Sequence, residues 1–341
     1  MLQANSIALP KIATYLPSPA SAESRVTTIR RWLMNLRVDV WSFYRPILEH
    51  ALQGWHSVHA LVILDGVTVF CDRWQIFRLS LMHGRRAIPL VWIVLPTEGL
   101  THMEKLEPML RRAAEFLNPR VCDVTFLADR GFRDCDWAEL CLKIGWNYVI
   151  RLANSTRIGL PDGQWIRLDR LTVSPQRCRT FQDALVARSV KWPASVTVTR
   201  TQPDAHGKSE VVAVMSNRSA GRKRLREYAH RMDIDESFRD DKSGGFDMEH
   251  TRLHHAERLE RLLLAVALAT LWCHELCEHV LTQGESARRM VDSGPKRELS
   301  LFQLGLRWLK RCLANLIHLL PAFRACLSPI KLKPVFKECS P

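Results

Sequence analysis

Acidic residues are in short supply in this chain. Its 341 residues include 35 Asp and Glu against 49 Lys and Arg, so the formal net charge is +14 and the pI is about 9.6. This cationic excess favours a polyanionic partner, of which DNA and RNA are the most common. A basic surface without a specific ligand is the alternative. With 341 residues, of which 47% are hydrophobic, the chain is long enough to form hydrophobic cores for two or three structural units.

Paired cysteines and long apolar runs are also missing. The ten cysteines form no C-x2-C pair, which excludes the usual zinc-finger spacing. Cys273 and Cys277 flank His274 in an apolar helical segment, where core-facing thiols are more common than zinc ligands. No signal peptide opens the sequence, which predicts free thiols in a reducing cytosol. The longest apolar run, residues 262–273, has 12 residues; it is too short to span a bilayer, so no membrane partner is expected.

Two acids come directly after apolar runs that are typical of β-strands. Residues 60–64 precede Asp65 and residues 124–128 precede Asp129. An Asp in such a place, taken alone, is more often a turn residue than a catalytic one. Further elements are expected along the chain: strands over 75–82, 87–95 and 147–151, and helices over 101–117 and 134–144. This order predicts an α/β fold with a ribonuclease-H-like core.

Changes in composition divide the chain into five segments. They are a helical N-terminal region (1–57), the first part of the core (58–151), a β-rich insertion (152–217), the helical end of the core (218–282) and a C-terminal helical region (283–341). The N-terminal region is either DNA-binding or a packing subdomain. In the insertion, short alternating runs predict strands over 165–168, 187–192, 195–200 and 210–215. Amphipathic residues 296–325 are a candidate dimerisation surface.

A helical stripe is the most informative motif. Tyr228, Arg231, Asp235 and Lys242 would lie at roughly 0°, 300°, 340° and 320° around a regular helix. A phenol, a guanidinium, a carboxylate and an ammonium on one stripe can face a single phosphate backbone. A solvated helix face with intrahelical ion pairs is the simpler alternative.

Three motifs in this order resemble those of bacterial insertion-sequence DDE transposases, the IS4-like class with a Y-x2-R-x3-E-x6-K signature. The first is Leu64-Asp65-Gly-Val-Thr68, followed by Asp72-Arg73 and residues 84–90; the second is residues 128–132, Ala-Asp-Arg-Gly-Phe; the third is residues 228–242, followed by Ser-Gly-Gly-Phe. The resemblance covers roughly residues 25–280. It implies strand cleavage and strand transfer at element ends.

The resemblance implies that Asp65 and Asp129 are the first and second metal-binding acids. The third acid should be Glu, but Asp235 stands at that position. Glu236 is the alternative, although on a regular helix it points about 100° away from Asp235. Three carboxylates without histidine fit hard cations, so the expected cofactor is Mg²⁺ or Mn²⁺, in two ions.

The same resemblance implies residues that bind DNA. Arg231, Lys242, Tyr228 and Arg130 would contact phosphates near the cut. Trp165 and Trp192 are the aromatic residues available for a flipped base in the insertion. The basic residues of the N-terminal region are candidate DNA contacts: Arg25, Arg30, Arg31 and Arg37. The expected partners are double-stranded DNA and, in the synaptic complex, a second copy of the chain. The expected location is the bacterial cytoplasm, at the nucleoid.

Two other functions remain open at this stage. Because Asp replaces the expected Glu, the chain could be a remnant that binds element ends without cutting them. A host nuclease on the same scaffold would cut DNA without preference for element ends. Fold analogy does not decide among these functions.

Overall fold

The structure is a computed structural model that describes residues 1–84, 86–97, 103–175, 177–203, 206–240, 245–248, 253–315 and 317–329, with only the backbone of Glu236. It divides into two compact units. Restricted to described residues, the first unit contains residues 1–56, 66–97 and 234–329, and the second contains residues 57–65 and 103–233. Strand β1 (His59–Val69) and helix α7 (Met232–Arg239) contribute residues to both.

The strands belong to one mixed sheet. Within the described residues its order is β3-β2-β1-β4-β5-β10-β9-β8-β6-β7. Strands β2 (Trp74–His83) and β3 (Arg86–Pro96) form an antiparallel hairpin. Strands β4 (Asp123–Ala128) and β5 (Asn147–Arg151) follow β1 in parallel. A hairpin that continues into three parallel strands is the ribonuclease-H-like arrangement, so the predicted fold class is confirmed.

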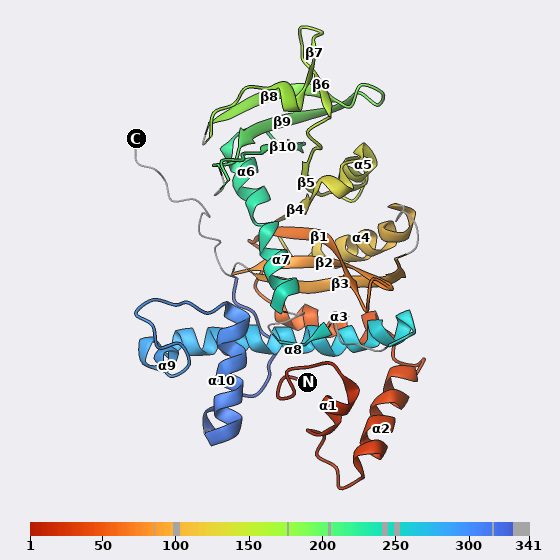
Figure 1. Ribbon diagram of the computed structural model, residues 1–341, viewed down its shortest axis with the longest axis vertical. Coiled ribbons are helices and arrows are strands. Elements are labelled where there is room, and N and C mark those ends of the chain that lie inside the picture. The colour runs from red at the N-terminus through yellow and green to blue at the C-terminus, as the bar shows by residue number, and fades with distance from the viewer. Residues whose placement is uncertain are drawn as a thin grey trace. The chain divides into compact units, whose positions relative to one another are not determined.

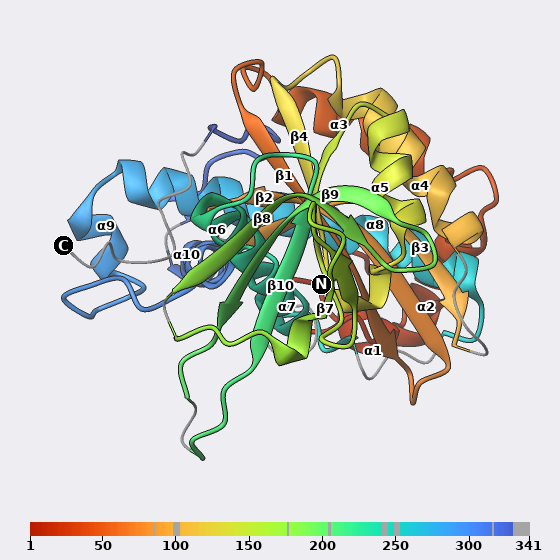
Figure 2. The same cartoon turned by 90° about the horizontal axis from the view of Figure 1, so that it is seen from above.

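The second unit places helices and a β-rich insertion around these parallel strands. The helices are α4 (Met103–Leu117), α5 (Cys135–Lys143) and α6 (Arg222–Ala229). The insertion contains β6 (Arg157–Gly159), β7 (Trp165–Arg167), β8 (Cys178–Val186), β9 (Trp192–Arg200) and β10 (Val211–Ser216). Figure 2 shows β8, β9 and β10 side by side, and their pairing is antiparallel. β10 also pairs with β5, which joins the insertion to the core strands.

The first unit gathers helices from both ends of the chain. They are α1 (Leu9–Ala13), α2 (Ala22–Met34), α3 (Val40–Ala51), α8 (Ala256–Thr282), α9 (Glu285–Arg289) and α10 (Leu301–Asn315). Ser21 and Asp39 start α2 and α3, because their side chains accept hydrogen bonds from the backbone N–H groups of Ser24 and Ser42. Figure 1 shows α10 crossing α8, and the two helices are in contact.

Helix α8 is the core helix of this unit. By length and composition alone it is apolar enough to cross a membrane, yet 67% of its most apolar window is buried. It packs against α10 and β3, and most of its Leu, Val and Cys side chains are buried. The buried apolar face explains its composition, since a helix that is hydrophobic on most sides needs protein on most sides.

Three sequence-based expectations about local structure were wrong. β1 does not end at Asp65 but continues to Val69. Residues 187–191 of the predicted strand over 187–192 form the turn between β8 and β9, where Ala187 and Lys191 adopt left-handed backbone angles, and Trp192 begins β9. The stripe from Tyr228 is not one helix: α6 ends at Ala229, and α7 begins at Met232.

Candidate active site

Two carboxylates lie side by side in the second unit. The parallel pairing of β1 and β4 ends with Leu64 opposite Ala128, and the next residue of each strand is an Asp. Asp65 is buried, at 8% exposure. Asp129 follows the end of β4, and one oxygen of its side chain accepts a hydrogen bond from the Gly131 N–H at 2.7 Å. The parallel register therefore brings Asp65 and Asp129 together.

Arg231 contacts both carboxylates. Its Nη2 lies 2.9 Å from Asp65 Oδ2 and 3.6 Å from Asp129 Oδ2. Arg231 occupies the turn between α6 and α7, where its N–H donates to the Tyr228 carbonyl at 2.8 Å. The guanidinium is mostly buried, so its charge is poorly screened and compensates the repulsion between the two acids.

A second arginine supports the phenol of the motif. Tyr228 is buried, and burial raises the pKa of its hydroxyl, while the charges of Arg151 and Arg231 oppose that rise. The Arg151 side chain also hydrogen-bonds to Tyr228. Arg151 Nη2 lies 2.7 Å from Glu210 Oε1, and the exposed Arg130 guanidinium lies 3.5 Å from the same oxygen. Tyr228, Arg130, Arg231 and Asp129 thus belong to one polar group in the second unit.

Sequence reasoning missed Arg151 and Glu210. Arg151 ends β5, the strand next to β4, so its position as the last residue of a predicted strand was the available signal. Glu210 precedes β10, which pairs with β5. That pairing joins residues about sixty positions apart and leaves no local pattern in the sequence.

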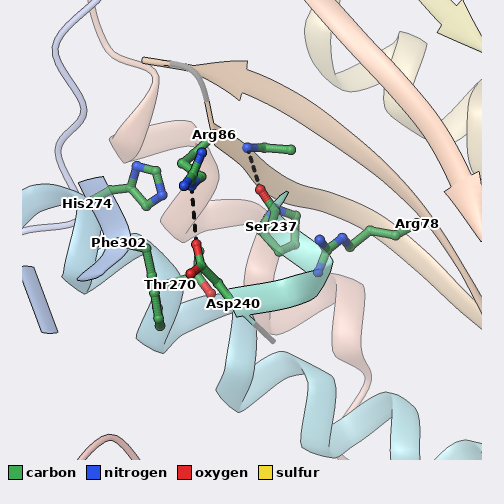
Figure 3. Close-up of a pocket in the computed structure, with 9 residues that line it drawn as sticks. Arg78, Arg86, Ser237, Asp240, Thr270, His274 and Phe302 are labelled. Atoms are coloured by element: carbon green, nitrogen blue, oxygen red, sulfur yellow. Dashed lines mark hydrogen bonds and ion pairs between the residues drawn. The ribbon is translucent and has the colours of Figure 1, made fainter. Parts of the chain in front are cut away.

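Asp235 lies in the first unit, on α7, and is partly exposed. The side chain of Glu236 and all of Lys242 lie outside the described residues. Two contacts fix α7 to the strand β3: the Ala87 N–H donates to Ser237 Oγ at 2.9 Å, and Arg86 Nε lies 3.2 Å from Asp240 Oδ2. Figure 3 shows both contacts converging beside His274 and Phe302.

The remaining candidates lie elsewhere in the two units. Arg30 and Arg31 are exposed on α2, Arg25 is partly exposed on the same helix, and Arg37 is exposed in the loop before α3. In the insertion, Trp165 packs over Gly159. Trp192 Nε1 donates to the Tyr148 hydroxyl at 3.0 Å, so this indole is already engaged in the protein interior.

The donor set suits a hard divalent cation. Asp65 and Asp129 supply carboxylate oxygens, which Mg²⁺ and Mn²⁺ prefer. Over the described part of the chain, no group of three His, Cys, Asp or Glu side chains is placed to hold a metal ion. Asp65 and Asp129 are a pair of neighbouring carboxylates in the second unit.

Fold and site together define the class of the protein: a ribonuclease-H-like domain with paired acids on adjacent parallel strands, one within β1 and one directly after β4. The Transposase DDE domain family matches residues 80–272, more than half of the chain. The chain belongs to this family.

The chain is also similar to solved structures, and one of them can be described. It is the cryo-EM structure of the piggyBac transposase synaptic complex with hairpin DNA, which shares 12% sequence identity with this chain at a TM-score of 0.46. The match covers 89% of this chain and 65% of that one, so the chain spans less than two thirds of that structure's length. No curated protein matches the sequence.

Proposed function

We propose that the chain is an insertion-sequence transposase of the IS4-like class, which cleaves DNA at element ends and joins those ends to target DNA. The observation that carries the proposal is the pair of acids Asp65 and Asp129 on adjacent parallel strands, with Arg231 against both. Membership in the DDE family supports it. The net charge of +14 suits a DNA substrate.

Asp65 and Asp129 would hold the divalent cations, Mg²⁺ or Mn²⁺, with Asp235 as the third acid and Glu236 as its alternative. When bound, a pair of such ions activates the attacking oxygen and stabilises the leaving oxygen of a phosphodiester. The strands fix the first two carboxylates, so little side-chain entropy is lost when they bind a ligand. Asp235 is one methylene shorter than Glu and reaches less far from α7.

The basic and phenolic groups around the acids would bind the DNA backbone. Arg231 and Arg130 carry charges that can pair with phosphates, and Lys242 is a third cation in the motif. Because burial raises its pKa, Tyr228 keeps its proton on Oη at neutral pH. With Arg151 hydrogen-bonded to the phenol, the Tyr228 O–H remains able to donate to a phosphate oxygen.

The partners in this function are double-stranded DNA and a second copy of the chain in the synaptic complex. The four arginines of the N-terminal region would contact DNA outside the cleavage site, and the C-terminal helical region is the proposed dimerisation surface. The cell compartment that fits a DNA substrate in a bacterium is the cytoplasm, at the nucleoid.

A cleavage assay tests the proposal. Duplex DNA carrying the element's own ends is incubated with Mg²⁺, with Mn²⁺ or with EDTA. The wild type should nick at the ends only with metal, and Asp129→Ala should abolish nicking. Asp235→Ala should also abolish it, and Glu236→Ala should not. Nicking lost with Glu236→Ala but kept with Asp235→Ala would identify Glu236 as the third acid.

A catalytically defective, end-binding protein is the second candidate, and the Asp at the position of the third Glu favours it. This candidate predicts that the wild type binds DNA carrying the element ends but does not nick it with Mg²⁺ or with Mn²⁺. In that case Asp235→Glu should restore cleavage, because it supplies the missing methylene. Random duplex in the same assay tests for a nuclease: equal cleavage of random and element-end DNA would contradict the transposase.

A further inference from the structure

A second concave site lies in the first unit, on residues that the proposed cleavage chemistry does not use. It is a cavity of about 790 Å³, within the range of small-molecule sites. We call it the N-terminal cavity. Its walls come from α1, α2, the turn after β1 and the start of α8; they include Leu9, Leu33, Phe70, Leu253, Arg30 and Arg258. Figure 1 shows α2 beside the cyan half of α8, and the two helices are in contact.

The cavity has uncompensated positive charge. Lys11 pairs with Asp247 at 3.5 Å. Over the described residues, the guanidinium groups of Arg30 and Arg258 have no ion pair, although both line the cavity. Unpaired guanidinium groups that converge on one cavity favour an anionic ligand, and a phosphate is the anion that their planar donors bind best.

An aromatic wall stands beside these charges. The rings of Phe70 and His254 meet edge to face with centroids 5.2 Å apart. Arg73 Nη1 lies 3.1 Å from His254 Nδ1, and this hydrogen bond ties the imidazole to the turn after β1. An aromatic pair beside the Arg30 and Arg258 guanidinium groups fits a flat, apolar ligand that carries a phosphate.

The walls are held by bonds between distant parts of the chain. The Ile7 N–H donates to the Phe246 carbonyl at 2.7 Å, and Ser6 Oγ donates to Asp247 at 3.3 Å. Phe70, Cys71 and Asp72 all have positive φ angles, between 49° and 59°. Three successive residues in this costly conformation persist only where the surrounding structure enforces it.

We propose that the N-terminal cavity binds one unpaired nucleotide of single-stranded DNA. Its base would lie against Phe70 and His254, and its phosphate would lie between Arg30 and Arg258. Stacking on an aromatic wall together with a phosphate contact is how proteins bind single strands without reading their sequence. The inference rests on the proposed function, because it assigns a further DNA subsite to the same protein.

The test is binding of the full-length chain to a fluorescein-labelled single strand of about 12 nucleotides, measured by anisotropy in EDTA. Arg30→Glu and Arg258→Glu should each weaken binding about tenfold or more, and Phe70→Leu should weaken it several-fold. Arg45→Glu is the matched control, since it makes the same charge change at an exposed position of α3 in the same unit, outside the cavity. It should weaken binding by less than about threefold.

Three results would overturn the inference. One is equal loss of binding in Arg30→Glu, Arg258→Glu and Arg45→Glu, which would show a general charge effect. Another is a wild type that does not bind the single strand. The third is a wild type that binds free deoxyadenosine monophosphate as tightly as the oligonucleotide, which would make the cavity a mononucleotide site. Binding in EDTA needs no cleavage, so failure of the nicking assay would reject the proposed function and leave this measurement intact.

Discussion

At the scale of single residues, the acids were predictable and their surroundings were not. Asp65 and Asp129 each follow an apolar run, and the parallel pairing of β1 and β4 brings the two acids close together. Arg151 and Glu210 meet only because β10 pairs with β5 across the insertion. A contact that depends on such long-range pairing cannot be inferred from residues near either partner.

Arg231 gives a prediction about charge at the paired acids. Arg231→Ala removes the guanidinium that lies against the buried Asp65 and the partly buried Asp129. In EDTA the variant should lose about 2–4 kcal/mol in the free energy of unfolding, because two acids would face each other without compensation. Mg²⁺ should raise its melting temperature more than that of the wild type, since the Arg231 guanidinium no longer competes for those oxygens.

Differential scanning fluorimetry with and without Mg²⁺ measures both effects. Arg177→Ala, at an exposed position in the same unit, is the control and should behave as the wild type does. Equal Mg²⁺ responses in Arg231→Ala and the wild type would contradict metal binding at these acids.

His274 gives a prediction about pH. It is buried beside His83, with 3.4 Å between their Nδ1 atoms. Burial lowers its pKa well below 6.5, and the nearby His83 and Arg86 lower it further. The unfolded chain therefore takes up a proton near that pH and the folded chain does not. Stability should fall as the pH drops below 6.5, by up to about 1.4 kcal/mol per pH unit for this one proton.

Urea denaturation at about pH 7.5 and pH 5.5 checks this slope. His274→Gln cannot take up the proton, so its stability should change less between the two values than that of the wild type. His318→Gln alters an exposed histidine and should leave the slope unchanged. An unaltered slope in His274→Gln would mean that other groups cause the pH dependence.

At the scale of elements, periodicity located most helices and strands but not their interruptions. The spacing of side chains from Tyr228 to Lys242 fits one long helix. The chain nevertheless turns at His230 and Arg231, between α6 and α7. The contact of 3.0 Å between the His230 ring and Asp233 stabilises that turn, and side-chain spacing does not reveal it. The turn places Arg231 against the acids, so the phase argument that linked Tyr228 to Asp235 on one face does not hold.

The crossing of α8 and α10 gives a prediction at this scale. Gly305 lies where α10 meets the backbone of α8, and a Cβ on it would overlap the carbonyl oxygen of Cys273. Gly305→Ala should therefore lower the free energy of unfolding by about 1–3 kcal/mol, through forced separation of the two helices. Leu313→Ala, at an exposed position of α10, should cost much less. Urea denaturation of both variants measures these two losses in the free energy of unfolding. Equal losses in Gly305→Ala and Leu313→Ala would contradict a tight crossing of α8 and α10.

At the scale of the whole molecule, the sequence indicates the ribonuclease-H-like order of strands and the insertion, because both follow from the alternation of apolar runs along the chain. It does not indicate which segments share a core. Each unit is assembled from segments that are separate in sequence, and β1 changes from one unit to the other between Asp65 and Gly66.

This assembly has a consequence for how the protein is made. The hairpin of β2 and β3 leaves the ribosome early, but α8, which packs on β3, follows more than 150 residues later. Until then, the apolar face of β3 has no cover from α8 and is exposed to aggregation or to chaperones. A copy of the gene truncated after α6 would encode most of the second unit, yet its product would keep that face permanently uncovered. Such a truncated chain should therefore be cleared by proteases and should not accumulate as a stable inhibitor.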